Sequence, residues 1–154
     1  MPTKRQKGGI LVLMGGLPLF YAGISQLIWF FNWLPDWSLP TDLLEIISFM
    51  GPFAFPILGV LVVVAGINLL FKKSSGEVLA LIGGIAASIW VIIYGISNLI
   101  SYILSPFPPP IQYIRYNLLY FIILNILLQD CPLIIGAILS YRSRSTFENT
   151  ESKI

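Results

Sequence analysis

The sequence contains no histidine and only one cysteine, Cys131. Without histidine, the chain has no histidine-ligated haem or metal site, and a conventional acid–base triad lacks its usual base. A single cysteine excludes an internal disulfide and any Cys-x-x-Cys redox or zinc motif, and Cys131 is expected to be a small packed residue. We therefore predict no catalytic residues and no metal ligands.

Charged residues are also scarce. They make up 10% of the 154 residues, whereas a soluble domain carries about 25%. Hydrophobic residues make up 56%, which indicates that lipid surrounds most of the chain. The net charge is only +2, and no basic stripe alternates with exposed aromatic residues, so nucleic acid is not an expected partner. The length fits a single domain.

Long apolar segments make up most of the chain. They cover residues 10–34, 43–71, 77–103 and 112–141, between a basic segment at 1–9 and a polar tail at 142–154 that is predicted to be disordered. At about 1.5 Å per residue, each is long enough to cross a hydrocarbon core about 30 Å thick. The first continues too far to be a cleaved signal peptide. We predict an all-α integral membrane protein, a four-helix transmembrane bundle.

The basic residues predict the orientation of this bundle. Most of them fall on one side of the predicted membrane: Lys4, Arg5, Lys7, Lys72, Lys73, Arg142, Arg144 and Lys153. On the other side Arg115 is accompanied by Asp36, Asp42 and Glu45. Positive charge is enriched in cytoplasmic loops, so we expect both termini in the cytoplasm or its equivalent, in a cell or organelle membrane.

Tryptophans mark the end of the first apolar segment, at Trp29, Trp33 and Trp37. Indole rings concentrate at headgroup depth, so these residues predict an interfacial belt. Asp42, with Glu45 three residues later, predicts a capped start for the second helix. Prolines predict kinks near residues 52–56 and at Pro132.

Small residues recur inside the apolar segments. Those expected at helix contacts are Gly59, Gly66, Ala80, Gly84, Ser88, Gly95 and Gly136. Small side chains let helix backbones approach closely in a membrane. The pairs Gly15-Gly16 and Gly83-Gly84 are explained in the same way and are not phosphate loops.

A weak internal repeat links the first and third apolar segments. Residues 12–16 (VLMGG) resemble 80–84 (ALIGG), and residues 23–28 (GISQLI) resemble 95–100 (GISNLI). These similarities favour a duplicated helical hairpin in parallel orientation. The alternative is chance similarity between apolar segments of low complexity.

A polar cluster interrupts the last apolar segment at Asn125, Gln129 and Asp130. Asn125 and Gln129 share a helical face, and Asp130 lies about 100° round from Gln129. Asp130 is expected near the bilayer centre, where a charged carboxylate is costly. It is interpreted either as a proton- or cation-binding group or as a neutral acid at the Pro132 kink.

Two further features bear on the polar cluster. Its possible hydrogen-bonding partners at similar depth are Ser88 and Tyr21. Towards the outer side, polar residues including Gln26 and Asn98 predict an outward-facing cleft near the tryptophan belt. No cofactor is predicted, but a lipid, a quinone or a pigment could occupy that cleft.

Three functions are compatible with these patterns. The leading one is a non-catalytic membrane subunit that scaffolds, assembles or stabilises a larger membrane complex. The alternative is a small proton- or ion-coupled transporter, a homo-oligomer that uses Asp130. The third is a membrane enzyme or redox helper that binds a quinone, lipid or pigment. The expected partners are membrane lipids and either other membrane subunits or further copies of the chain.

Overall fold

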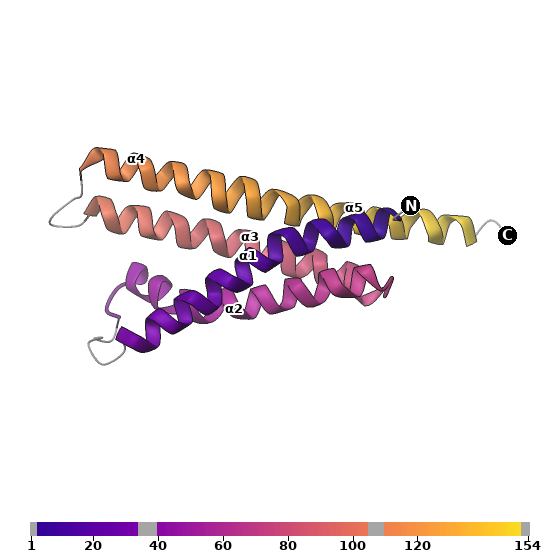
Figure 1. Cartoon of the computed structure of the whole chain (residues 1–154), viewed down its shortest axis with the longest axis horizontal. Coiled ribbons are helices and arrows are strands. Elements are labelled where there is room, and N and C mark those ends of the chain that lie inside the picture. Colours follow the sequence, from indigo (N-terminus) through magenta and orange to yellow (C-terminus); the bar gives the residue numbers. More distant parts are fainter. Residues whose placement is uncertain (1–2, 34–39, 105–109, 152–154) are drawn as a thin grey trace.

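The computed structural model describes residues 3–33, 40–104 and 110–151, which form an elongated bundle of helices (Figure 1). The first three are α1 (Lys4–Trp33), α2 (Leu43–Leu70) and α3 (Ser75–Leu104). A fourth rod consists of α4 (Ile111–Tyr120), the π-helix η2 (Phe121–Asp130) and α5 (Cys131–Glu151). Four helical stretches are long and apolar enough to cross a membrane, as predicted: Lys4–Asn32, Leu43–Leu70, Ser75–Leu104 and Ile114–Arg142.

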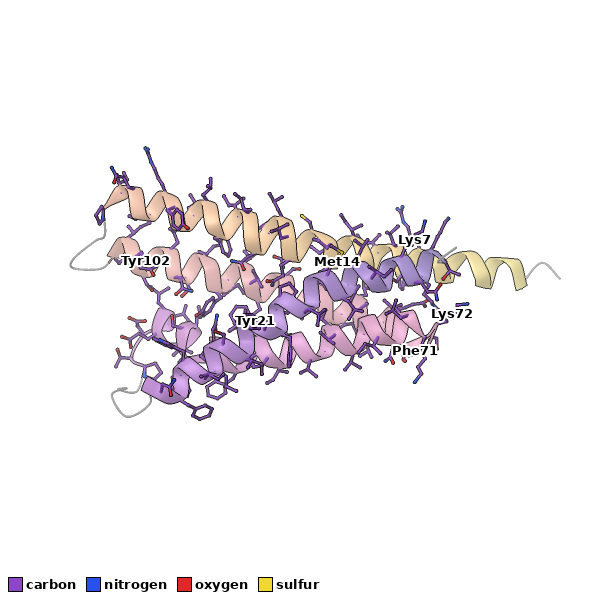
Figure 2. All side chains as sticks on the ribbon, viewed as in Figure 1. Lys7, Met14, Tyr21, Phe71, Lys72 and Tyr102 are labelled. Atoms are coloured by element: carbon purple, nitrogen blue, oxygen red, sulfur yellow. The ribbon has the colours of Figure 1, made fainter. Side chains whose placement is uncertain are left out.

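The helices extend beyond the apolar segments at the end of the bundle that carries Lys7 and Lys72 (Figure 2), which we call the basic end. α1 already begins at Lys4, inside the segment expected as a separate basic terminus. α5 continues to Glu151, so the prediction of a disordered tail is wrong for residues 142–151. These residues include no glycine or proline, and extending an existing helix is much easier than starting one.

Capping and proline chemistry set the shape of the far end, opposite the basic end. The predicted cap of α2 is confirmed: Asp42 Oδ1 accepts the Glu45 backbone N–H at 2.8 Å, and Glu45 Oε2 accepts the Thr41 N–H at 2.7 Å. α2 continues through Pro52 and Pro56, and Figure 1 shows its first turns pointing away from the axis of the remainder.

The predicted kink at Pro132 takes a different form, because the ten residues from Phe121 to Asp130 adopt the wide π-helix η2. A proline in an α-helix removes an N–H and collides with the carbonyl four residues earlier. The π pattern pairs each carbonyl with the N–H five residues on, which allows carbonyls ahead of a proline to bond beyond it. The fourth rod therefore continues without a sharp bend (Figure 1).

α1, α2, α3 and α5 each pack against two neighbours. α1 and α3 both contact α2 and α5, so α1 and α3 occupy opposite corners of the bundle. Large side chains that are fully buried between them include Val12, Leu19, Val62, Leu69 and Leu133. At the far end, Phe30 of α1 packs edge-on against Phe53 and Phe49 of α2, with ring centroids 5.0 and 5.4 Å apart.

Glycines on two faces of α1 set its distance from its neighbours. Gly9, Gly16 and Gly23 face α2, where an added Cβ would lie 2.9, 2.6 and 2.4 Å from the nearest α2 atom. Gly8 and Gly15 face α5 and the end of η2, where the corresponding distances are 2.1 and 2.4 Å. A spacing of seven residues is close to two helical turns, which keeps each row on one face. α1 is therefore in close contact on both sides.

The two Gly-Gly pairs occupy related places. The first hairpin consists of α1 and α2, and the second consists of α3 and the fourth rod. The first glycine of each pair faces the other hairpin: Gly15 of α1 faces Leu133 of α5, and Gly83 of α3 faces Leu61 of α2. The second glycine faces the second helix of its own hairpin, because Gly16 lies against Val62 and Gly84 against Leu133. Two hairpins related by an approximate twofold axis would have this arrangement. The duplication of one hairpin in the sequence stays a prediction.

The other small residues predicted at contacts differ in how tightly they are packed. Gly59 and Gly66 face Phe20 and Leu13 of α1, and Gly136 lies against the Gly8 carbonyl; an added Cβ at any of the three would lie 2.6–2.7 Å from its neighbour. Gly95 lies under the ring of Phe121. Of the remaining three, Ala80 and Ser88 carry small side chains that are buried. Gly84 is less tightly packed, because an added Cβ would have its nearest atom at 3.5 Å.

This difference makes a matched pair of substitutions informative. Gly23→Ala should destabilise the bundle by about 1–3 kcal/mol, because the new methyl group meets the α2 backbone at Pro56, which cannot rotate away. Gly84→Ala should be neutral or slightly stabilising, because its methyl group has room and alanine favours helix. Thermal unfolding in detergent micelles measures both. Equal losses of stability would contradict this account of the contacts.

Candidate functional site

A cleft of about 310 Å³ opens between the helices in the far half of the bundle. Its walls come from α1, α2, α3, α4 and η2: Ala22, Gln26, Phe55, Val91, Tyr94, Gly95, Ile96, Asn98, Leu99, Tyr102, Leu118, Phe121, Asn125 and Gln129. The labelled Tyr102 marks its position towards the far end (Figure 2). A volume of this order is at the lower end of the range for small-molecule sites.

Four amide side chains line the cleft, and none of the residues described in its walls is charged. Gln26 and Asn98 were predicted to meet at such a cleft, and the structure brings them together there. Asn125 and Gln129 join them from η2, which agrees with their predicted shared face. The cleft therefore offers neutral hydrogen-bonding groups in an otherwise apolar setting.

The amides are held in different ways. Asn98 donates from Nδ2 to the backbone carbonyl of Tyr94 at 2.9 Å, one turn earlier on α3. Gln129 is almost fully buried. Gln26 is half-buried, and its Oε1 atom is buried without a hydrogen-bond donor among the described residues. A buried acceptor that lacks a donor lowers stability by about 1–3 kcal/mol unless something else pairs with it.

Aromatic rings form the remaining wall. Phe55 of α2 and Tyr94 of α3 are perpendicular, with centroids 4.9 Å apart. Phe121 reaches across from η2 and covers Gly95, where a Cβ would lie 2.0 Å from the ring. The cleft exists because α4 and η2 have few contacts with the other helices, whereas α1 and α2 are in close contact at the same level.

Of the predicted tryptophan belt, the structure describes the side chain of Trp29 alone, and this side chain does not contribute to the cleft. Trp29 is 53% exposed on α1 and is not part of the cleft wall. The Trp33 side chain and the whole of Trp37 lie outside the described residues. The belt therefore stays a prediction.

Asp130 lies apart from the cleft although it directly follows Gln129. Its side chain is only 3% exposed, and neither carboxyl oxygen has a hydrogen-bond donor among the described residues. The buried Ser88 hydroxyl of α3 is close enough to interact with it, but outside hydrogen-bonding geometry. The predicted proximity of Ser88 is confirmed, whereas Tyr21 is wrong as a partner because it is 77% exposed.

The structure also contains a buried ion pair that sequence reasoning missed. Arg5 of α1 pairs with Glu77 in the first turn of α3, and the Glu77 side chain is fully buried. Arg5 also donates to the Lys72 backbone carbonyl at 2.8 Å, in the turn between α2 and α3. Lys72 has a positive φ of 59°, and the Lys72 and Lys73 N–H groups donate back to the Leu69 and Asn68 carbonyls, which ends α2 and leads the chain into α3. The pair and the turn together join three helices at the basic end.

Comparisons with protein-family models, with curated proteins and with solved structures found no match to this chain. Within the described ranges, no group of three or more His, Cys, Asp or Glu side chains is placed to hold a metal ion.

The Arg5–Glu77 pair predicts a pattern of stabilities. Arg5→Met should destabilise the bundle by about 3 kcal/mol, because it leaves the buried Glu77 carboxylate without its cation. Combining it with Glu77→Leu should recover much of that loss, because no isolated charge remains. Thermal unfolding of the single and double variants measures the coupling. A double variant less stable than Arg5→Met alone would contradict this role of the pair.

Proposed function

We propose that this chain is a non-catalytic subunit of a larger membrane complex, which it scaffolds or stabilises. The observation that carries the proposal is the isolation of α4 and η2. Among the described residues, the other long helices have close neighbours on two sides, whereas α4 has few contacts with α3, and η2 has few with α1 and α3. This part of the fourth rod is available to an additional helix.

The side chains that α4 and η2 leave exposed are mostly large and apolar. They include Ile111, Tyr116, Leu119, Leu127 and Leu128. In a membrane such a surface contacts either lipid or another protein. Because helix association in lipid depends on packing rather than on the hydrophobic effect, a helix with little intrachain packing gains most from a partner.

The proposal includes an orientation. Basic side chains at the basic end include Lys4, Lys7, Lys73 and Arg142, whereas Arg115 lies on α4 towards the far end. The enrichment of cations on the cytoplasmic side supports placing the basic end, and thus both termini, in the cytoplasm or its equivalent. A cysteine introduced at Lys72 tests this placement with a thiol reagent that cannot cross the membrane. Labelling only after the cells are opened would agree with the placement, and labelling of intact cells would contradict it.

Site-directed photocrosslinking tests the partner surface. A photoreactive residue at Leu119 of α4 should give an adduct with a larger membrane protein, whereas one at the equally lipid-accessible Ile57 of α2 should not. Extraction in a mild detergent should recover the same partner with the unmodified chain. Recovery as a monomer, or an adduct only twice the mass of the chain, would count against a subunit of a larger complex.

A second candidate function, a small proton- or ion-coupled transporter, is favoured by one observation. Asp130 and Ser88 place three buried oxygen atoms near one another, and none has a hydrogen-bond partner among the described residues. A polar group within the bilayer is costly, so such groups often serve in proton or ion transfer. The separation of Asp130 from the cleft weighs against a continuous path.

Flux measurements test this second candidate. In proteoliposomes, Asp130→Asn should reduce ion or proton flux at least about tenfold without lowering the amount of inserted protein, because the amide cannot exchange a proton or neutralise a cation. Asp42→Asn changes an exposed carboxylate at the far end and serves as the control. Normal flux through the Asp130 variant would exclude the transporter function.

A further inference from the structure

We propose that the cleft binds one neutral membrane lipid that carries a free hydroxyl group, of the diacylglycerol kind. This inference goes beyond the role of the chain as a subunit and does not depend on it. It rests on the length of the cleft, on the absence of charge in its described walls and on the unpaired oxygen of Gln26.

The cleft has the length of part of a lipid. Its wall on α3 runs from Val91 to Tyr102, which spans about 16 Å at an α-helical rise of about 1.5 Å per residue. This is about half the thickness of a bilayer hydrocarbon core. The cleft volume of about 310 Å³ is therefore distributed along the bundle, and an elongated ligand fits it better than a compact one.

The chemistry of the walls selects against ionised ligands. Phosphate and carboxylate groups are bound in proteins mainly by Arg, Lys or helix N-termini, and the described cleft wall contains neither cationic side chains nor a helix start. Removing an ionised headgroup from water without a counter-charge would be strongly unfavourable. A neutral headgroup avoids this penalty, and Gln26, Asn98, Asn125 and Gln129 are all neutral.

The unpaired Gln26 oxygen identifies the hydrogen-bonding group that the ligand must supply. Oε1 is an acceptor, so it needs a donor. A hydroxyl group supplies that donor and can also accept from a neighbouring amide. A quinone headgroup offers only carbonyl acceptors and would leave Oε1 unpaired. The hydroxyl-bearing lipid is therefore favoured over the quinone.

Apart from this polar contact, the cleft walls offer apolar surface that suits an acyl chain. Phe55, Val91, Tyr94 and Phe121 present apolar surface along the cleft. Ala22 carries only a methyl group, and this leaves space open, whereas Gly95 is covered by the Phe121 ring. The cleft thus combines hydrogen-bonding amides with apolar surface, which match the two parts of a neutral lipid.

Photolabelling of the full chain in phosphatidylcholine vesicles tests the inference. The probe is a diacylglycerol with a diazirine in one acyl chain, and labelled peptides should contain the cleft segments 91–102 or 118–129. Gln26→Leu should reduce this labelling about fivefold, the value of one hydrogen bond. Ala22→Leu should reduce it at least about fivefold, because the larger side chain fills the cleft.

Matched controls separate binding from folding. Asn32→Leu removes an exposed amide from α1, and Ala86→Leu enlarges a small residue of α3 outside the cleft wall; both should label like the unmodified chain. Unfolding temperatures identify any variant that has lost its fold. If one of the two cleft variants, Gln26→Leu or Ala22→Leu, is unfolded, the labelling of the other one tests the inference. Cleft labelling that no cleft variant changes would overturn the inference. Preferential labelling by diazirine phosphatidylcholine or by a photoreactive quinone would also overturn it.

Discussion

The close approach of α1 to two neighbours is the contact on which the rest of the bundle depends. Its glycine rows place its backbone against α2 on one side and against α5 on the other. In lipid, where burial of apolar surface contributes little to association, such close packing is a main source of stability. The Phe30 ring cluster continues the α1–α2 contact to the far end. Among the residues that the structure describes, no comparable contact holds α4, and the cleft opens on that side.

Much of the architecture follows from local patterns in the sequence. Segment length and hydropathy are sufficient to predict the four described helical stretches that are long and apolar enough to cross a membrane, and Asp42 with Glu45 is sufficient for the start of α2. The polar residues of the outer half also placed Gln26 and Asn98 correctly on one cleft. These features depend on helical periodicity, which a sequence specifies directly.

The features that sequence reasoning missed depend on which helix ends meet. Glu77 looks like an ordinary first-turn residue until the α2–α3 turn brings it beside Arg5; a lone acid close to a basic cluster was the available signal. Tyr21 was a plausible partner for Asp130 by depth alone, but the rotation of α1 exposes it. The π-helix leaves no local composition signature apart from Pro132, so its length could not be predicted.

The π-helix has a consequence for the relation between sequence length and surface. Each residue in an α-helix turns the chain by about 100°, and a π segment turns it by less. The ten residues of η2 therefore fix the angular phase of α4 relative to α5. Leu118 faces the cleft only while this phase is kept. The number of residues between Tyr120 and Pro132, and not only their identity, determines which side of α4 is presented to a ligand and which to the surroundings.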